Sequence, residues 1–340
     1  MMKRGLPVLA AVAAMSVASW SSAAVLLSDG FNTAASSANY NTYITAGATG
    51  PSGDATFGYD YGAAPASGGL AVPVAPHTTD GSTTGLRLRT DNLQSSSGTV
   101  VGATEVVTKG LTLPSTYVVQ VDVWSNYIGG TNISASGSNG TTGVTVGVGT
   151  SGNSIQYVAA NDGLLTEGFG DNGGGANQAY RLYLDNTHPN PTTASYWAAG
   201  TSTTSASNTD PYYTGFLPSV SAPSAQSTFS STQSGSTAAG TLGFAWHTWT
   251  ITNDGTNFIW AIDGNTITTS PVSAVTLGGN QVSLGNDDTG LTGNSSANNQ
   301  LFNAELFDNL TITDTTVPEP ASLGLLAVAA LPLLRRRRNA

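Results

Sequence analysis

Residues 244–269 show the clearest two-residue alternation of side chains in the 340-residue chain. From 246 to 252, Trp and Thr at even positions alternate with His, Trp and Ile at odd positions, which is the period of a β-strand. The pattern resumes at 257–262 and at 266–269. Asp-Gly pairs stand at both breaks, where Gly tolerates the positive φ of a tight hairpin turn. The segment is therefore predicted to form a three-stranded antiparallel meander, with Gly255 and Gly264 in its turns.

Further short strands are predicted where β-branched and aromatic residues gather between Gly- and Asn-rich turns. Strong helix formers such as Lys and Glu are scarce, and no long helical period occurs. Many short strands indicate an all-β sandwich or jelly roll. The predicted strands outside the meander are Val25–Leu27, Leu86–Thr90, Val100–Val107, Tyr117–Trp124, Val144–Val148, Ile155–Ala160, Tyr180–Leu184, Val282–Leu284 and Ala304–Thr313.

Two regions interrupt the strand pattern. Residues 185–240 are rich in Ser, Thr, Ala and Pro and also contain several aromatic residues, while 46–69 is a shorter Gly-, Ala- and Ser-rich excursion. Long loops without regular structure are unusual in compact domains and are often functional or mobile. The 185–240 segment is expected to be either an insertion over one face of the sandwich or a flexible arm.

The N-terminal residues have the order of a secretory signal. Lys3 and Arg4 precede the apolar Leu6–Val17 region, and Ser22-Ala23-Ala24 supplies small residues at a cleavage position. Residues 1–24 are therefore predicted to be a helical signal peptide that signal peptidase removes during export. The β-sandwich domain is then expected to span 25–316.

The C-terminal residues form a second targeting signal. Val317, Pro318, Glu319 and Pro320 precede an apolar run at 321–334, and Arg335, Arg336, Arg337 and Arg338 follow it. This apolar run is shorter than the roughly 20 residues that a bilayer span needs. The segment 317–340 resembles the PEP-CTERM sorting signal of exported bacterial proteins. That resemblance implies a sorting helix, transient membrane insertion, recognition by an exosortase, cleavage near Pro-Glu-Pro, and delivery to the cell surface or the extracellular matrix.

A second resemblance concerns the body of the chain. Trp249-Thr-Ile-Thr-Asn-Asp-Gly followed by Phe258-Ile-Trp-Ala-Ile-Asp-Gly is similar to the paired central strands of concanavalin A-like, laminin-G-like domains. Ser28-Asp29-Gly30-Phe31 and Phe307–Ile312 resemble the first and last strands of that family. The resemblance implies a jelly-roll sandwich of two antiparallel sheets whose terminal strands pair, and it does not by itself imply an activity.

The charge of the predicted body excludes one class of partner. Residues 25–317 contain four cationic side chains and nineteen acidic ones, which gives a net charge of −15, compared with −10 for the whole chain. Such a surface repels nucleic acid and anionic lipid. The chain contains no Cys, so an exported body must be stabilised by its hydrophobic core.

Catalytic machinery is not evident in the sequence. Glycoside hydrolysis needs two carboxyl groups about 5–10 Å apart, and no Glu-x-Asp-x-x-Glu run supplies them on one strand. Glu105, Glu167 and Glu305 are isolated in sequence, although carboxylates from different strands can still meet. The chain lacks a Gly-x-Ser-x-Gly elbow in a suitable context, and His77, His188 and His247 do not cluster, which disfavours zinc. We therefore expect a protein without catalytic activity.

Two binding hypotheses remain. Asn286-Asp287-Asp288-Thr289 and Asp171-Asn172-Gly173 offer oxygen ligands, so Asp287 and Asp288 are candidate Ca²⁺ ligands, although ordinary Asx turns explain the same residues. Trp197, Tyr212 and Tyr213 could form a platform on which sugar rings stack, or they could pin the insertion to the sandwich by burying apolar area. No other cofactor is expected.

These observations predict an exported, non-catalytic cell-surface or extracellular-matrix protein with polysaccharide as the expected ligand. The alternative is a glycan-active enzyme, a glycoside hydrolase or lyase, whose carboxylates come from separate strands.

Overall fold

The computed structural model describes residues 23–45, 53–90, 102–126, 142–156, 162–170, 179–185, 205–231, 233–288 and 297–316. Residues 24–316 form one compact unit. The predicted sorting segment, nearly all of the predicted signal peptide, and Asp171, His188 and Trp197 lie outside the described residues.

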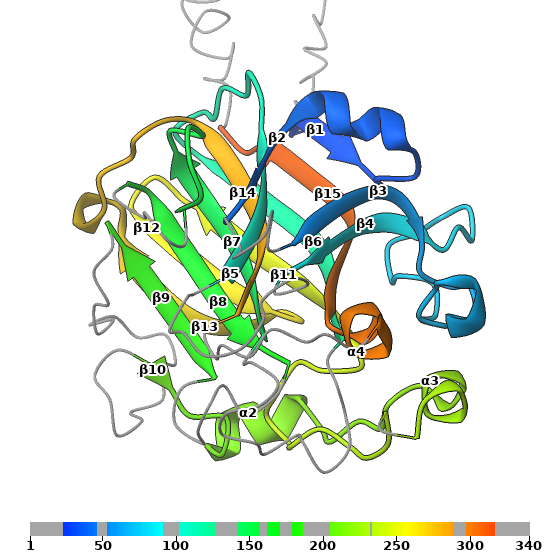
Figure 1. Cartoon of the computed structure of the whole chain (residues 1–340). Helices are drawn as coiled ribbons and strands as arrows, with labels where there is room; N and C mark the ends of the chain where they lie inside the picture. Colours follow the sequence, from blue (N-terminus) through cyan, green and yellow to red (C-terminus); the bar gives the residue numbers. More distant parts are fainter. Residues whose placement is uncertain are drawn as a thin grey trace, which may run out of the picture. The chain divides into compact units, whose positions relative to one another are not determined.

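The chain forms two antiparallel sheets packed face to face (Figure 1). The larger sheet has eight of the described strands in the order β13-β12-β11-β6-β15-β4-β3, and β1 also pairs with β15. Its strands are β1 (Ala24–Asp29), β3 (Asp54–Asp60), β4 (Thr84–Arg89), β6 (Tyr117–Asn126), β11 (Trp246–Asn253), β12 (Asn257–Ile262), β13 (Asn265–Pro271) and β15 (Ala304–Asp314).

The second sheet has seven of the described strands in the order β10-β9-β8-β7-β14-β5-β2. Its strands are β2 (Tyr40–Ile44), β5 (Gly102–Thr108), β7 (Thr142–Thr150), β8 (Leu164–Phe169), β9 (Tyr180–Leu184), β10 (Ser205–Ala206) and β14 (Gln281–Asp288). The described part of the chain is therefore an all-β, two-sheet antiparallel sandwich.

The hydrophobic core lies between the sheets because alternate residues of their strands point inward and most of these are apolar. Trp249 and Ile251 of the larger sheet and Val146 of the smaller sheet are buried in one cluster. The indole rings of Trp249 and Trp260 stack with centroids 5.1 Å apart. The Trp249 indole Nε1 donates a 3.1 Å hydrogen bond to Thr166 Oγ1, so the largest core side chain also links the two sheets.

Short helices cover the ends and edges of the sandwich. They are η1 (Ala34–Asn39), η2 (Pro65–Ser67), α2 (Pro211–Phe216), α3 (Ser224–Phe229), η3 (Val272–Ala274) and α4 (Ala297–Phe302). Helix α2 begins where its sequence predicts, because the Asp210 carboxylate caps the Tyr212 amide and Pro211 occupies the first turn. Figure 1 shows α2 and α3 at the same end of the sandwich.

The described parts of the insertion, 205–231 and 233–240, belong to the sandwich. Strand β10 pairs with β9 at the edge of the seven-stranded sheet. Further along, Gln226 of α3 donates hydrogen bonds of 2.7 Å to the Leu70 carbonyl and to Asn126 Oδ1 at the end of β6. This segment is therefore a packed cover rather than a flexible arm.

The predicted meander is confirmed. Strand β11 pairs with β12 and β12 with β13 in antiparallel register. Gly255 and Gly264 adopt φ values of 88° and 75°, the left-handed conformation that favours glycine. The predicted pairing of the terminal strands is also confirmed, since Ser28 lies opposite Thr311 and Asp29 opposite Leu310.

Some predicted boundaries are wrong. The excursion at 46–69 contains β3, and β8 was not predicted because Leu164–Phe169 lacks an alternating pattern. The predicted strand Ile155–Ala160 is not a strand at Ile155 and Gln156, the two residues that the structure describes there. Gln156 instead folds back toward the sheet, as described below.

Candidate functional site

Three acidic residues lie on the face of the seven-stranded sheet that points away from the core. Glu105 on β5 lies opposite Gly285 on β14, which lies opposite Thr145 on β7, which in turn lies opposite Glu167 on β8. Asp287 follows two residues after Gly285 and therefore points to the same side. We call this surface the carboxylate face. Glu105, Glu167 and Asp287 are each at most 1% exposed.

Glycine makes room for two of these carboxylates to face each other. A Cβ atom placed on Gly143 of β7 would lie 2.6 Å from Asp287 Oδ1 and 2.9 Å from Glu167 Oε1. Strands β8 and β14 flank β7 on opposite sides, so the two side chains reach over the bare backbone of Gly143 from both directions. Glu167 Oε1 accepts no hydrogen bond from the residues that the structure describes. The pair is not evident from the sequence, because the two residues are remote along the chain.

The other oxygen of Glu167 is held by its neighbours. The Tyr183 hydroxyl donates a 2.7 Å hydrogen bond to Glu167 Oε2, and Arg181 Nη1 lies 3.6 Å from the same atom. Burial and the Glu167 carboxylate raise the pKa of Tyr183 well above its usual value, and the opposing effect of Arg181 is smaller. Tyr183 is therefore a hydrogen-bond donor to Glu167 at physiological pH.

The chain itself covers another part of the carboxylate face. The Gln156 backbone amide donates a 2.7 Å hydrogen bond to Glu105 Oε2, and Ser283 Oγ donates one of the same length to Gln156 Oε1. The Gln156 side chain lies directly over Gly147, where a Cβ atom would leave it no room. Two carboxyl groups that face each other can serve as an acid and a base, and here Glu167 and Asp287 are both enclosed.

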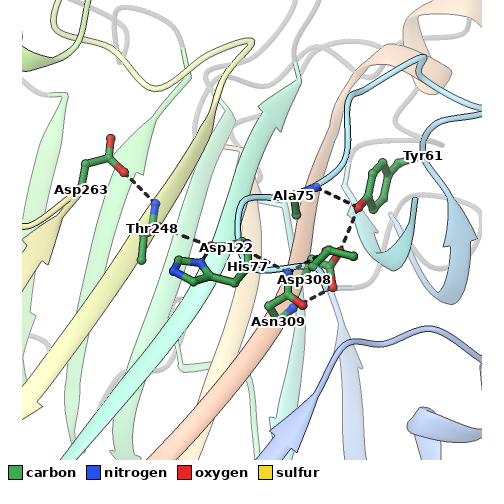
Figure 2. Close-up of polar contacts among 9 residues, drawn as sticks. Tyr61, Ala75, His77, Asp122, Thr248, Asp263, Asp308 and Asn309 are labelled. Atoms are coloured by element: carbon green, nitrogen blue, oxygen red, sulfur yellow. Dashed lines mark hydrogen bonds and ion pairs between the residues drawn. The ribbon is translucent and has the colours of Figure 1, made fainter. Parts of the chain in front are cut away.

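A second polar cluster occupies the outward face of the eight-stranded sheet (Figure 2). Asp122 of β6 lies directly opposite Asp308 of β15, and both side chains are buried. His77 donates a 3.0 Å backbone hydrogen bond to Asp122 Oδ2, and its ring Nδ1 lies 2.7 Å from Asp122 Oδ1. Asn309 Nδ2 donates a further 2.9 Å hydrogen bond to Asp122 Oδ2. These contacts fasten the loop around His77 onto the sheet.

Asp308 is surrounded by donors of its own. The Tyr61 hydroxyl donates at 2.9 Å, the Asn309 amide at 2.7 Å and Thr78 Oγ1 at 3.3 Å. Burial nevertheless raises the pKa of Asp308 to about 6, with a further contribution from the neighbouring Asp122 carboxylate. Every carboxylate oxygen of Asp122 and Asp308 accepts a hydrogen bond, so the geometry indicates a structural cluster rather than an open site. We call these two residues the aspartate pair.

The two described histidines therefore differ in environment. The side chain of His77 is 46% exposed. His247 faces the core, and its Nδ1 lies 2.7 Å from Asp263 Oδ2 in the turn after β12. Each histidine is oriented by one aspartate and they do not meet, as the sequence indicated.

The aromatic residues of α2 are distributed between the core and its margin. Tyr213 is fully buried, and its ring stacks on Tyr180 with centroids 4.4 Å apart. Tyr212 is partly buried, and its hydroxyl donates a 2.8 Å hydrogen bond to the Thr266 carbonyl of β13. These contacts favour the pinning alternative, because Tyr213 offers no ring face to a sugar.

The predicted calcium ligands do not lie in a turn. Asn286 and Asp287 are residues of β14, where Asn286 Nδ2 donates a 3.2 Å hydrogen bond to the Leu88 carbonyl and Asp287 belongs to the carboxylate face. Asp288 ends the strand, and its side chain lies outside the described residues. Within the described ranges, no group of three or more His, Cys, Asp or Glu side chains is arranged to hold a metal ion.

Among the helices that the structure describes, none combines the length and apolar character of a membrane span. The predicted membrane-inserting segment at 321–334 falls outside those residues.

Comparisons with known proteins give remote similarities. No family model matches the chain, and no curated protein matches it. Among solved structures it is similar to a Bacillus subtilis protein of unknown function with a galectin-like fold, at 10% identity and a TM-score of 0.40, covering 86% of this chain and 96% of that one. It is also similar to an endo-1,3-beta-glucanase from Streptomyces sioyaensis, at 14% identity and a TM-score of 0.41, covering 86% and 96%. The Emp46p carbohydrate recognition domain in its potassium-bound form matches at 8% identity and a TM-score of 0.40, covering 86% and 97%. These similarities are too remote to transfer an activity.

Proposed function

We propose that this protein is an exported, non-catalytic component of the cell surface or extracellular matrix that binds polysaccharide. Its body is a laminin-G-like member of the concanavalin A-like sandwiches, a class supported by the paired terminal strands and the Asp-Gly meander. Signal peptidase and an exosortase are its partners during export, and the segment at 321–334 holds it in the membrane until processing.

The observation that carries the non-catalytic part is the closure of the carboxylate face. Glu105 is hydrogen-bonded by the Gln156 backbone, and Glu167 by the Tyr183 hydroxyl. Acid–base catalysis needs at least one carboxyl group within reach of substrate. Here the acidic side chains are buried, and their hydrogen bonds stabilise the fold.

Export and processing are tested on protein recovered from its native host. Intact-mass spectrometry should show loss of residues 1–24 and of the segment after about Pro320. A mature chain that retains Arg335–Arg338 would contradict the sorting proposal and leave the binding proposal standing.

One observation favours the second candidate, a glycan-active enzyme. Glu167 and Asp287 face each other over Gly143, and glycoside hydrolysis uses two carboxyl groups brought together in this way from different parts of the chain. An enzyme would have to open the face during turnover.

The two candidates differ in a direct assay. The full chain is incubated with neutral and acidic polysaccharides, and the release of new chain ends is measured alongside Glu167→Gln and Asp287→Asn. We expect no turnover by any of the three proteins. Turnover by the wild type that either substitution abolishes would establish the enzyme.

A further inference from the structure

The larger sheet carries a broad uncharged surface on its outward face. Two rows of side chains cross six adjacent strands, β1, β15, β6, β11, β12 and β13. The strand registers place the first row as Val25–Thr313–Val118–Thr252–Ile259–Thr269 and the second as Ser28–Thr311–Gln120–Thr250–Ala261–Thr266. We call these two rows the threonine face.

This surface is open, in contrast to the carboxylate face. Val25 is 61% exposed, and every other member except the buried Ala261 is partly or fully exposed. Helix α2 reaches one end of the second row, where the Tyr212 hydroxyl donates a hydrogen bond to the Thr266 carbonyl. The next row, Asp308–Asp122–Thr248, is covered by the loop around His77 (Figure 2).

The threonine face is also neutral on a strongly acidic body. None of its twelve side chains is charged, whereas the body carries a net charge of −15 from four cations and nineteen acids. Asp254 and Asp263 stand at its border, in the turns that follow β11 and β12. The adjacent Asp122 and Asp308 are buried and hydrogen-bonded, so they do not extend the acidic surface onto the rows.

The side chains combine hydroxyl groups with aliphatic carbon. Six of the twelve are threonines, each with a hydroxyl that donates and accepts and a methyl group beside it. Their β-branched side chains are stiff at χ1, so little rotamer entropy is lost when a ligand orders them. Neighbouring strands lie about 4.8 Å apart and alternate residues along a strand about 6.7 Å apart, which gives a regular grid.

We infer that the threonine face is a docking surface for a neutral, hydroxyl-rich polysaccharide chain. This inference rests on the proposed function and names the surface and the chemical class of its ligand. Sugar hydroxyls would exchange hydrogen bonds with the threonines and Gln120, while C–H surfaces of the rings would contact the threonine methyl groups, Val118 and Ile259. A polyanionic chain is disfavoured, because none of the twelve side chains of the face is cationic and acidic residues border the surface.

The test removes hydroxyls while it keeps side-chain shape. Thr250, Thr252, Thr311 and Thr313 are replaced together by Val in the full chain, and mobility is measured by affinity electrophoresis in gels containing hydroxyethylcellulose. Loss of several hydrogen bonds should weaken retention roughly tenfold or more. Retention should be absent from alginate gels with either protein. The matched control, Thr42→Val with Thr276→Val, changes exposed threonines away from the face and should leave retention unchanged.

A milder variant distinguishes a loss of binding from a loss of folding. Thr250→Ser with Thr311→Ser keeps both hydroxyls and should retain most of the binding, while circular dichroism and thermal melting check each fold.

Each outcome has a distinct meaning. Equal retention of the wild type and the fourfold variant would overturn the assignment of this face and leave polysaccharide binding elsewhere. A wild type that no neutral polysaccharide gel retains would overturn the proposed function itself. A wild-type dimer that becomes monomeric in the fourfold variant, measured by light scattering, would show that the face joins two copies of this chain and would also overturn the inference.

Discussion

The two outward faces of this sandwich use polar residues in opposite ways. The carboxylate face of the seven-stranded sheet gathers three acids, an arginine and a tyrosine, and encloses nearly all of them. The threonine face of the eight-stranded sheet has no charge and stays open. Enclosed polar groups fix one geometry because each unmet hydrogen bond is costly there, whereas open hydroxyls remain available to a ligand. The carboxylate face therefore has reactive groups that are enclosed, whereas the threonine face has exposed groups that are uncharged.

The largest loss of folding stability is expected from Glu167→Ala on the carboxylate face. The substitution removes the acceptor of the Tyr183 hydroxyl and a carboxylate beside Arg181, which should destabilise the fold by roughly 2–4 kcal/mol. Relief of repulsion with Asp287 offsets part of this cost. Urea denaturation measures the difference, and Glu167→Gln, which keeps an acceptor, should cost less. A more stable Glu167→Ala protein would show that the carboxyl pair is strained rather than supportive.

A smaller effect is expected from filling the space between the two acids. The new side chain of Gly143→Val would collide with Asp287 Oδ1 and Glu167 Oε1, both of which are ends of enclosed side chains. Overpacking of this kind costs roughly 1–3 kcal/mol. The matched control is Gly110→Ala, whose Cβ would meet no atom within 4 Å although its φ of 65° still imposes some backbone strain. Equal midpoints for Gly143→Val and wild type would mean that the two carboxylates do not converge there.

The aspartate pair beside the threonine face, Asp122 and Asp308, should make the stability of the fold depend on pH. The pKa of Asp308 is raised to about 6 in the folded state, compared with 3.8 for the free side chain. The folded protein therefore binds this proton more tightly than the unfolded chain does. Asp308 should contribute stability that is present below pH 4 and is lost as the pH rises through 6, on the order of 1–2 kcal/mol.

The measurement compares melting temperatures at pH 5 and pH 7.5. The gain at pH 5 should shrink in Asp308→Asn, which cannot titrate, and persist in Asp80→Asn on an exposed turn. An unchanged pH profile in Asp308→Asn would assign the effect to another group.

Local patterns predicted the fold better than the site. The alternation through 246–252 and the Asp-Gly turns placed the meander, because both signals act over a few residues. The same alternation in β7, where Gly143, Thr145 and Gly147 separate three valines, indicates a strand with one apolar and one small, polar face. What the sequence could not show is that β14 and β8 flank this strand and bring Asp287 and Glu167 together, since strand order depends on non-local pairing. Tyr213 of α2 illustrates the same limit, because its ring stacks on Tyr180 of the distant strand β9.

The smallest effect on stability is expected on the threonine face. Thr252 is partly exposed on β11, and replacing it by Val keeps the β-branched shape, so the free energy of unfolding should change by less than about 0.5 kcal/mol. The matched buried position is Thr166, whose Oγ1 donates a 2.8 Å hydrogen bond to the Val146 carbonyl and accepts one from the Trp249 indole. Thr166→Val removes the acceptor of the Trp249 indole N–H and the side-chain hydrogen bond to the Val146 carbonyl, and should cost roughly 1–3 kcal/mol. Urea denaturation of the two variants measures both values in one experiment. If Thr252→Val proved as damaging as Thr166→Val, the threonines of the outward face would be structural rather than available, and the contrast between the two faces would fail.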